Sequence, residues 1–129
     1  MDIRCVVTGQ DKSGKSLIRR DKGVQPVTVA LIPGYESHRL WGSDSWPELP
    51  SDGAGPLQPR YFPAKNGFRF GFFTLPPATK TRTEQIVTAS ALEEMQEKLP
   101  GMTDVLEPDH PGVHTTDSVD FDVVISGEV

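Results

Sequence analysis

The sequence predicts a mostly β domain, an antiparallel β-sandwich that contains one α-helix. The chain has 12 glycines and 12 prolines in 129 residues, which is typical of short strands joined by many turns. Residues 118–126 alternate between apolar and other side chains with the period of a strand. Residues 83–99 switch to the period of a helix. A chain of this length suffices for one core, so we expect a single domain over residues 1–129.

Charge and cysteine content exclude several functions. A net charge of −5 disfavours nonspecific binding to nucleic acid, which requires a positive surface. Cys5 is the only cysteine, so the chain has no internal disulfide and no cysteine-based zinc site. Its apolar neighbours favour a buried, inert thiol. No apolar stretch has the length of a signal peptide or of a membrane span, and we predict a cytoplasmic protein without a membrane partner.

The first two strands are predicted at residues 3–9 and 16–20. The intervening GQDKSGK supplies turn residues, and a hairpin is therefore expected. Gly9–Ser16 also fits the phosphate-binding loop of nucleotide triphosphatases. That loop needs a helix that begins at Lys15 and faces the phosphates. Pro26 follows too soon for such a helix, so the hairpin is favoured.

Three more strands are predicted in the middle of the chain, at residues 26–32, 36–41 and 68–75. The last of these is apolar on both faces, which suits the centre of a sandwich. Residues 42–63 are rich in Gly, Pro, Ser and Asp and predict a long loop. A loop of that length is either functional or disordered.

Trp41, Phe70 and His38 are the predicted ligand-binding residues. Trp41 and Trp46 flank the start of the long loop, where an indole lines a ligand mouth or instead pins the loop to the core. For His38 the alternative is an ordinary hydrogen-bonded or surface histidine. A binding module predicts thermal stabilisation by its ligand, which falls when Trp41 or Phe70 is changed.

The helix is predicted to begin near Thr81, because Thr81 and Glu84 fit a capping box. Pro100 follows it and ends it. One side of this helix carries Thr88, Ala91, Leu92, Met95 and Leu99. This stripe predicts packing against a sheet, and we expect no cofactor there.

The last stretch, residues 112–129, is predicted to be a strand that carries a small polar site. His114, Thr116 and Asp120 are all even-numbered, and on an extended backbone they share one face. Histidine titrates near neutrality, so His114 is the predicted general acid and base. Asp120 would orient its ring, and Thr116 would donate to a substrate oxygen. The alternative is that His114 and Asp120 only satisfy each other.

The same residues resemble the first motif of the cupin superfamily. His114, Thr116, Asp120 and Gly127 keep the spacing of two histidines, an acidic residue and a glycine in that motif. The run HTTDSVDFDVVISGE is similar to small single-domain cupins. CVVTGQD, KSLIRRD and SHRLWGSD resemble their opening strands, so the likeness covers most of the chain with gaps.

The resemblance implies a jelly-roll barrel, incomplete at its C-terminal end, with an inserted helix at about 83–99. Thr116 replaces the second histidine of the motif, and the second cupin motif is absent. We therefore expect no metal and no other cofactor, with a divalent metal at His114 and Asp120 as the weaker alternative.

The function implied by the resemblance is a metal-independent isomerase, cyclase or dehydratase that acts on a small organic molecule. The alternative is a non-catalytic ligand-binding or structural domain. A last strand without a neighbour would leave an open sheet edge, so a homodimer with sheet exchange is also predicted.

Overall fold

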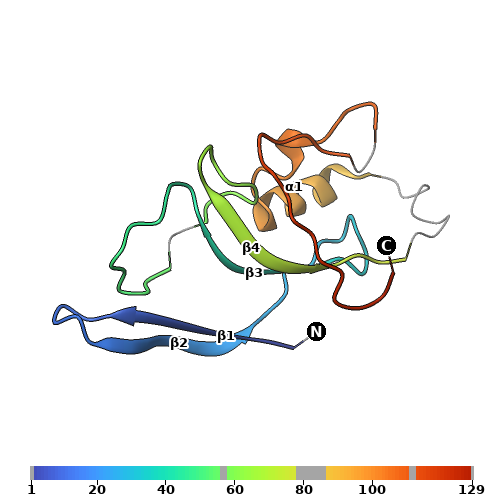
Figure 1. Ribbon diagram of the computed structural model, residues 1–129. Coiled ribbons are helices and arrows are strands. Elements are labelled where there is room, and N and C mark those ends of the chain that lie inside the picture. Colours follow the sequence, from blue (N-terminus) through green and yellow to red (C-terminus); the bar gives the residue numbers. More distant parts are fainter. Residues whose placement is uncertain (1, 56–57, 78–86, 111–112, 129) are drawn as a thin grey trace.

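A computed structural model describes residues 2–55, 58–77, 87–110 and 113–128. This part of the chain is mostly β, as predicted. Two antiparallel two-stranded sheets are formed, one by β1 and β2 and the other by β3 and β4. Figure 1 shows the β1–β2 hairpin on one side of the β3–β4 sheet and the helix α1 on the other. The elements are β1 Ile3–Gln10, β2 Ser16–Val24, β3 Glu36–Ser43, β4 Phe68–Thr74, α1 Ala89–Lys98 and a short 3-10 helix Thr103–Val105.

The β1–β2 hairpin confirms the prediction made from the GQDKSGK turn. Asp11 Oδ1 accepts hydrogen bonds from the backbone N–H groups of Ser13 at 2.8 Å and Lys15 at 3.0 Å. Gly14 has φ of 81°, a conformation that glycine adopts without steric cost. The chain continues from Lys15 directly into β2. The helix that a phosphate-binding loop requires is therefore replaced by a strand.

The β3–β4 sheet also agrees with the sequence prediction, whereas the strand predicted at residues 26–32 is wrong. Only Val27 of that run pairs, in an isolated bridge with Ser37. The chain then turns, because Ile32 N–H donates to Val29 O and Tyr35 N–H donates to Ile32 O. The apolar side chains of this run pack into the core beside α1, so hydrophobic burial here stabilises a turn instead of a strand.

Helix α1 lies within the predicted helical range, and its start differs from the predicted one. Thr88 is the N-cap, and its Oγ1 accepts a hydrogen bond from Ala91 N–H at 3.2 Å. This bond satisfies one of the free N–H groups of the first turn. The capping box predicted at Thr81 and Glu84 lies outside the described residues. Leu99 ends the helix as its C-cap, immediately before the proline.

The main core lies between α1 and the turn that precedes β3. Met95 and Leu99 pack there against Val29 and Tyr35. The Tyr35 hydroxyl lies 2.7 Å from that of Tyr61. Burial raises the pKa of Tyr35, and the neighbouring Tyr61 adds to this effect. The Met and Leu stripe of the helix is thus core packing, as predicted.

Glu94 joins α1 to the turn that precedes β3, and it makes the stability of the fold depend on pH. It accepts hydrogen bonds from Lys98 Nζ at 2.6 Å and from Ala30 N–H at 2.9 Å. These bonds, that of Lys98 first, lower the pKa of Glu94. A lowered carboxyl pKa stabilises the fold above the ordinary glutamate value of about 4.3, and the contribution disappears as pH falls through the folded-state pKa.

We therefore expect Glu94→Gln to be less stable than the wild type at neutral pH. The difference in free energy of unfolding should shrink as pH falls below about 4.3. Urea unfolding at several pH values measures this difference. Glu97→Gln, an exposed site on the same helix, is the control. A difference for Glu94→Gln that does not change with pH would contradict the assignment.

The strand predicted at residues 118–126 is not formed. Apart from the isolated bridge between His114 and Leu106, the described residues 113–128 belong to no sheet. Phe121 is 91% exposed, and Val119, Val123 and Ile125 are exposed beside it. Alternation gives a segment the pattern of a strand, but a strand also needs a neighbour to bond with. No closed barrel occurs within the described ranges, and the jelly-roll fold stays a prediction.

Candidate functional site

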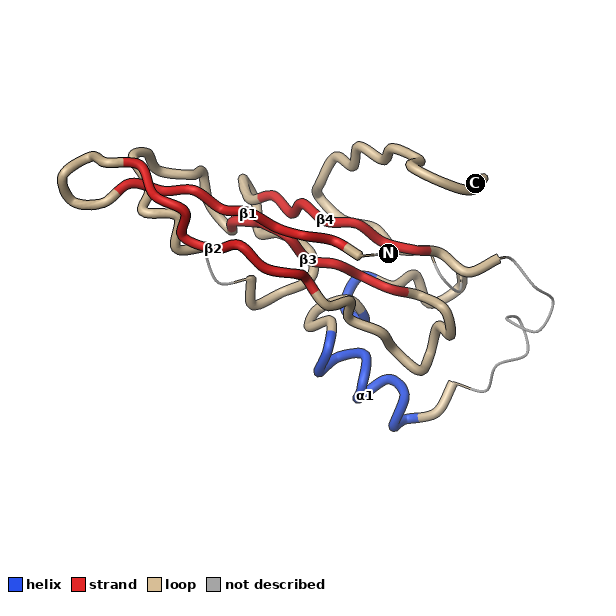
Figure 2. The backbone as a smooth tube through the Cα atoms, turned by 90° about the horizontal axis from the view of Figure 1, so that it is seen from below, coloured by secondary structure: helices blue, strands red, loops and turns tan. Residues whose placement is uncertain are grey.

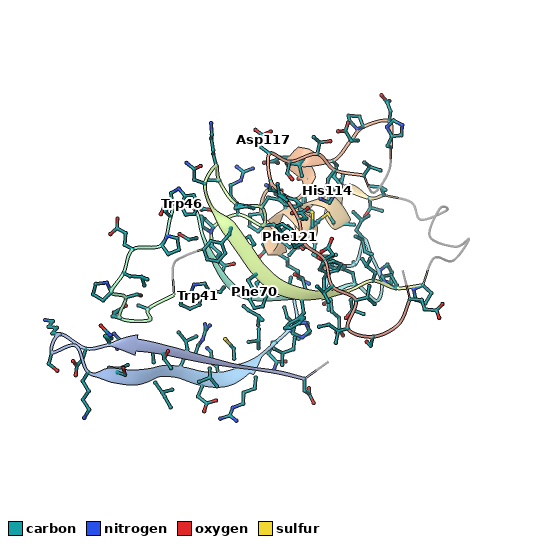
Figure 3. The ribbon with its side chains drawn as sticks, in the orientation of Figure 1. Trp41, Trp46, Phe70, His114, Asp117 and Phe121 are labelled. Atoms are coloured by element: carbon teal, nitrogen blue, oxygen red, sulfur yellow. The ribbon has the colours of Figure 1, made fainter. Side chains whose placement is uncertain are left out.

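The three predicted ligand-binding residues lie on one face of the β3–β4 sheet. His38 is opposite Phe72 in the register, and Trp41 is opposite Phe70. Residues directly opposite each other point to the same face, as do residues two apart on one strand. Figure 3 shows Trp41 and Phe70 on the side of the sheet that faces the β1–β2 hairpin. The sequence analysis placed His38 and Trp41 on one predicted strand and Phe70 on another, without relating the three to one another.

Several side chains in the layer between the hairpin and this sheet face are only partly buried. Ile3, Cys5 and Val7 of β1 are half-buried, and Phe70 of β4 is 58% exposed. The main core lies on the other side of the sheet, beside α1. Seen from below in Figure 2, the β1–β2 hairpin overlaps the β3–β4 sheet, and Figure 1 shows the two strand pairs as separate layers. Part of the apolar and aromatic surface of this face, that of Phe70 above all, therefore remains accessible.

Arg20 of β2 reaches across this layer, a role that the sequence analysis did not predict. Its Nη2 donates to the carbonyl oxygen of Leu40 at 3.3 Å and to Cys5 Sγ at 3.4 Å. Its Cζ lies 5.9 Å from the centroid of the Trp41 ring, within the range of a cation–π interaction. The sequence pattern of residues 16–24 predicts this role only once the hairpin register is known. In that register Arg20 lies opposite Val7, so both side chains point to the inward face of the hairpin.

Two polar atoms at this face are buried without a hydrogen-bond partner among the described residues. They are Arg20 Nε and His38 Nε2. His38 is 1% exposed, so water does not reach its ring from bulk. Burial of an unpaired polar group costs roughly 1–3 kcal/mol. A polar ligand group would therefore gain the most binding free energy by forming a hydrogen bond with these nitrogens.

The predicted catalytic residues are arranged differently from the expectation. The exposed His114 makes a tilted ring contact with Phe62, with centroids 4.9 Å apart and an interplanar angle of 35°. Thr116 Oγ1 lies 2.7 Å from Ser118 Oγ, which donates to Asp120 Oδ1 at 3.5 Å. Thr116 and Asp120 are thus joined through Ser118, and His114 contacts a different partner. Ser118 has the same even spacing, so the alternation rule would have found it. The acid–base role of His114 stays a prediction.

Two arginines on the opposite face of the sheet fix the end of the long loop. Arg39 Nη2 donates to the carbonyl oxygens of Gln58 at 2.9 Å and Arg60 at 2.7 Å. Arg69 donates to the carbonyl oxygens of Arg60 and Phe62. Burial lowers the pKa of Arg39, and the charge of Arg69 lowers it further. Backbone acceptors, together with Asp44 in the case of Arg69, thus occupy these guanidinium groups and hold the loop in place.

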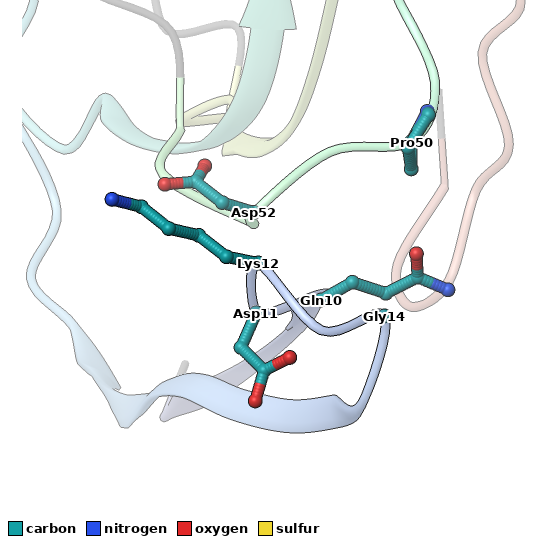
Figure 4. Close-up of a pocket in the computed structure, with 6 residues that line it drawn as sticks. All are labelled: Gln10, Asp11, Lys12, Gly14, Pro50 and Asp52. Atoms are coloured by element: carbon teal, nitrogen blue, oxygen red, sulfur yellow. The ribbon is translucent and has the colours of Figure 1, made fainter.

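A pocket of about 340 Å³ lies at the tip of the β1–β2 hairpin (Figure 4). The turn and the long loop line it with Gln10, Asp11, Lys12, Gly14, Pro50 and Asp52. Asp11 is engaged by its own turn, and Asp52 pairs with Arg19 at 2.8 Å. A hydrogen bond from the Ser13 hydroxyl, followed by these backbone bonds, lowers the pKa of Asp11. The Ala54 N–H, followed by Arg19, lowers the pKa of Asp52. Two ionised carboxylates make this pocket unsuitable for the phosphates that the Gly9–Ser16 pattern suggests.

Comparison with protein-family models, with curated proteins and with solved structures returned no match. The cupin resemblance stays a prediction, as does the homodimer. Within the described ranges, no three His, Cys, Asp or Glu side chains are grouped to hold a metal ion. Over the same ranges, α1 is too short and too polar to cross a membrane, and no other helix is longer.

Proposed function

We propose that this chain is a small-molecule binding module. It holds a single-ring aromatic ligand in the layer between the β1–β2 hairpin and the β3–β4 sheet. This corresponds to the non-catalytic form of the cupin-like function that the sequence resemblance implies. One observation carries the proposal. The predicted residues His38, Trp41 and Phe70 share a sheet face that protein covers only in part.

The composition of this face supports an aromatic ligand. Phe70 and Phe72 form a tilted pair with ring centroids 6.1 Å apart, and Trp41 lies opposite Phe70. Aromatic rings favour tilted or offset contacts with further rings. Removal of exposed apolar surface from water contributes about 25 cal/mol per Å². Phe70, which is 58% exposed, has the most surface to lose when a ligand covers it.

A panel of neutral and anionic single-ring aromatic compounds tests the proposal by thermal shift. A ligand at 100 times its Kd should stabilise the fold by about 2.7 kcal/mol. The Trp46→Phe background leaves Trp41 as the only tryptophan, so its fluorescence reports occupancy of this layer. We expect at least one compound both to raise Tm and to change the Trp41 emission.

Phe70→Ala is expected to weaken binding about tenfold or more, since loss of a buried phenyl contact costs on the order of 2 kcal/mol. Phe73→Ala is the matched control, because Phe73 is also half-exposed on β4 but points to the opposite face. Equal losses for the two variants would contradict the proposal. A panel in which no compound stabilises the wild type would also contradict it.

A further inference from the structure

We propose that the ligand of this layer carries a carboxylate, which is bound by Arg20 and His38. This inference rests on the proposed function and specifies the chemistry of its ligand. The site is formed by Arg20 from β2, His38 from β3 and the ring of Trp41 beside them. It is separate from the predicted His114 site and from the pocket at the hairpin tip.

The charge of Arg20 is the first argument. Four other arginines form ion pairs with aspartates, namely Arg4 with Asp21, Arg19 with Asp52, Arg60 with Asp104 and Arg69 with Asp44. Within the described residues, Arg20 donates only to a thiol and a carbonyl oxygen. A half-buried cation without a counter-charge is costly. An anionic ligand group would supply the missing charge.

The two unpaired nitrogens are the second argument. Arg20 Nε–H is a donor in a fixed planar fork, and His38 Nε2 is a donor when the ring proton resides there. Arg20 reaches the carbonyl of Leu40, and His38 lies two residues before Leu40 on β3. Arg20 therefore crosses the layer about two residues along β3 from His38, whose side chain shares the sheet face of Trp41.

A carboxylate matches this arrangement better than other anions. Its two oxygens accept one hydrogen bond from each nitrogen, and charge-assisted bonds of this kind are short and strong. A doubly charged phosphate would need more donors to offset its larger desolvation in an apolar layer. An aromatic ring attached to the carboxylate would then lie along Trp41 and Phe70, which share the face with His38.

Benzoate and its neutral isostere benzamide provide the test, with the Trp46→Phe protein and Trp41 fluorescence as the readout. We expect benzoate to bind at least about tenfold more tightly than benzamide, the difference that one charge-assisted hydrogen bond gives. Arg20→Gln should abolish this preference. Arg19→Gln, which removes a neighbouring charge that pairs with Asp52 instead, should retain it.

The outcomes separate the two proposals. Equal binding of benzoate and benzamide would overturn the carboxylate inference and leave the binding module standing. A preference for benzoate that persists in Arg20→Gln would overturn the role of Arg20. If neither compound binds while other members of the aromatic panel do, the carboxylate inference is wrong and the binding module still stands. If nothing in the panel binds, the proposed function fails with it.

Discussion

Leu99→Ala is expected to lower the free energy of unfolding by about 2–5 kcal/mol. Leu99 is 0% exposed and packs in the core with Val29, Tyr35 and Met95. Truncation removes buried methyl groups and leaves a cavity that its neighbours fill only in part. The loss is large for a small domain, whose total stability is typically about 5–15 kcal/mol. Urea unfolding followed by circular dichroism measures it.

Leu92→Ala is the control for this prediction. Leu92 lies on the same helix and is 37% exposed, so its truncation removes less buried surface and leaves a smaller cavity. We expect its effect to be less than half that of Leu99→Ala. Similar effects of the two variants would show that the core between α1 and the turn before β3 contributes less than its burial indicates.

Gly71→Ala is expected to destabilise the protein by about 1–3 kcal/mol through overpacking. A Cβ at Gly71 would lie 2.5 Å from the carbonyl oxygen of His38, which is backbone and cannot move without disturbing β3. The two strands would separate at the register that aligns His38 with Phe72. Ligand binding in the layer should weaken together with stability, and thermal unfolding with and without benzoate measures both effects.

Gly23→Ala is the matched control, since Gly23 is also a strand glycine. The nearest atom to a Cβ at Gly23 is Ile3 O, at 3.9 Å, which is an ordinary contact. Replacement of glycine by alanine where the conformation permits it stabilises by about 0.4–1 kcal/mol. We therefore expect Gly23→Ala to be neutral or slightly stabilising. A destabilisation equal to that of Gly71→Ala would refute the steric explanation.

Local chemistry made much of the fold predictable. The turn residues between β1 and β2 specify a hairpin without any knowledge of the rest of the chain. The apolar run at residues 68–75 and the helical stripe that ends at Leu99 likewise carry their own signals. Residues 26–32 and 118–126 have equally good strand patterns and do not form strands. Pairing depends on a second segment, and periodicity within one segment does not contain that information.

The candidate site was only partly predictable for the same reason. Trp41 and Phe70 drew attention as aromatic residues, and His38 as a titratable one. Their common face depends on the β3–β4 register, with its irregularity between Arg39 and Trp41. Arg20 enters through the packing of one hairpin on another sheet, which no local pattern encodes. Proton transfer at His114 stays a prediction, and its partner Phe62 comes from the long loop.

The long loop of residues 42–63 is held at two places, and these determine where the chain can accept an insertion. The Gln10 N–H bond to Ser51 O at 3.0 Å holds one part of the loop to the hairpin, and Arg39 and Arg69 hold its end. Residues 45–50, which lie between β3 and the Ser51 anchor, are exposed. Lengthening a free loop costs only about 0.6 kcal/mol per doubling. A peptide tag is therefore best inserted beside Leu49, where neither anchor would be displaced.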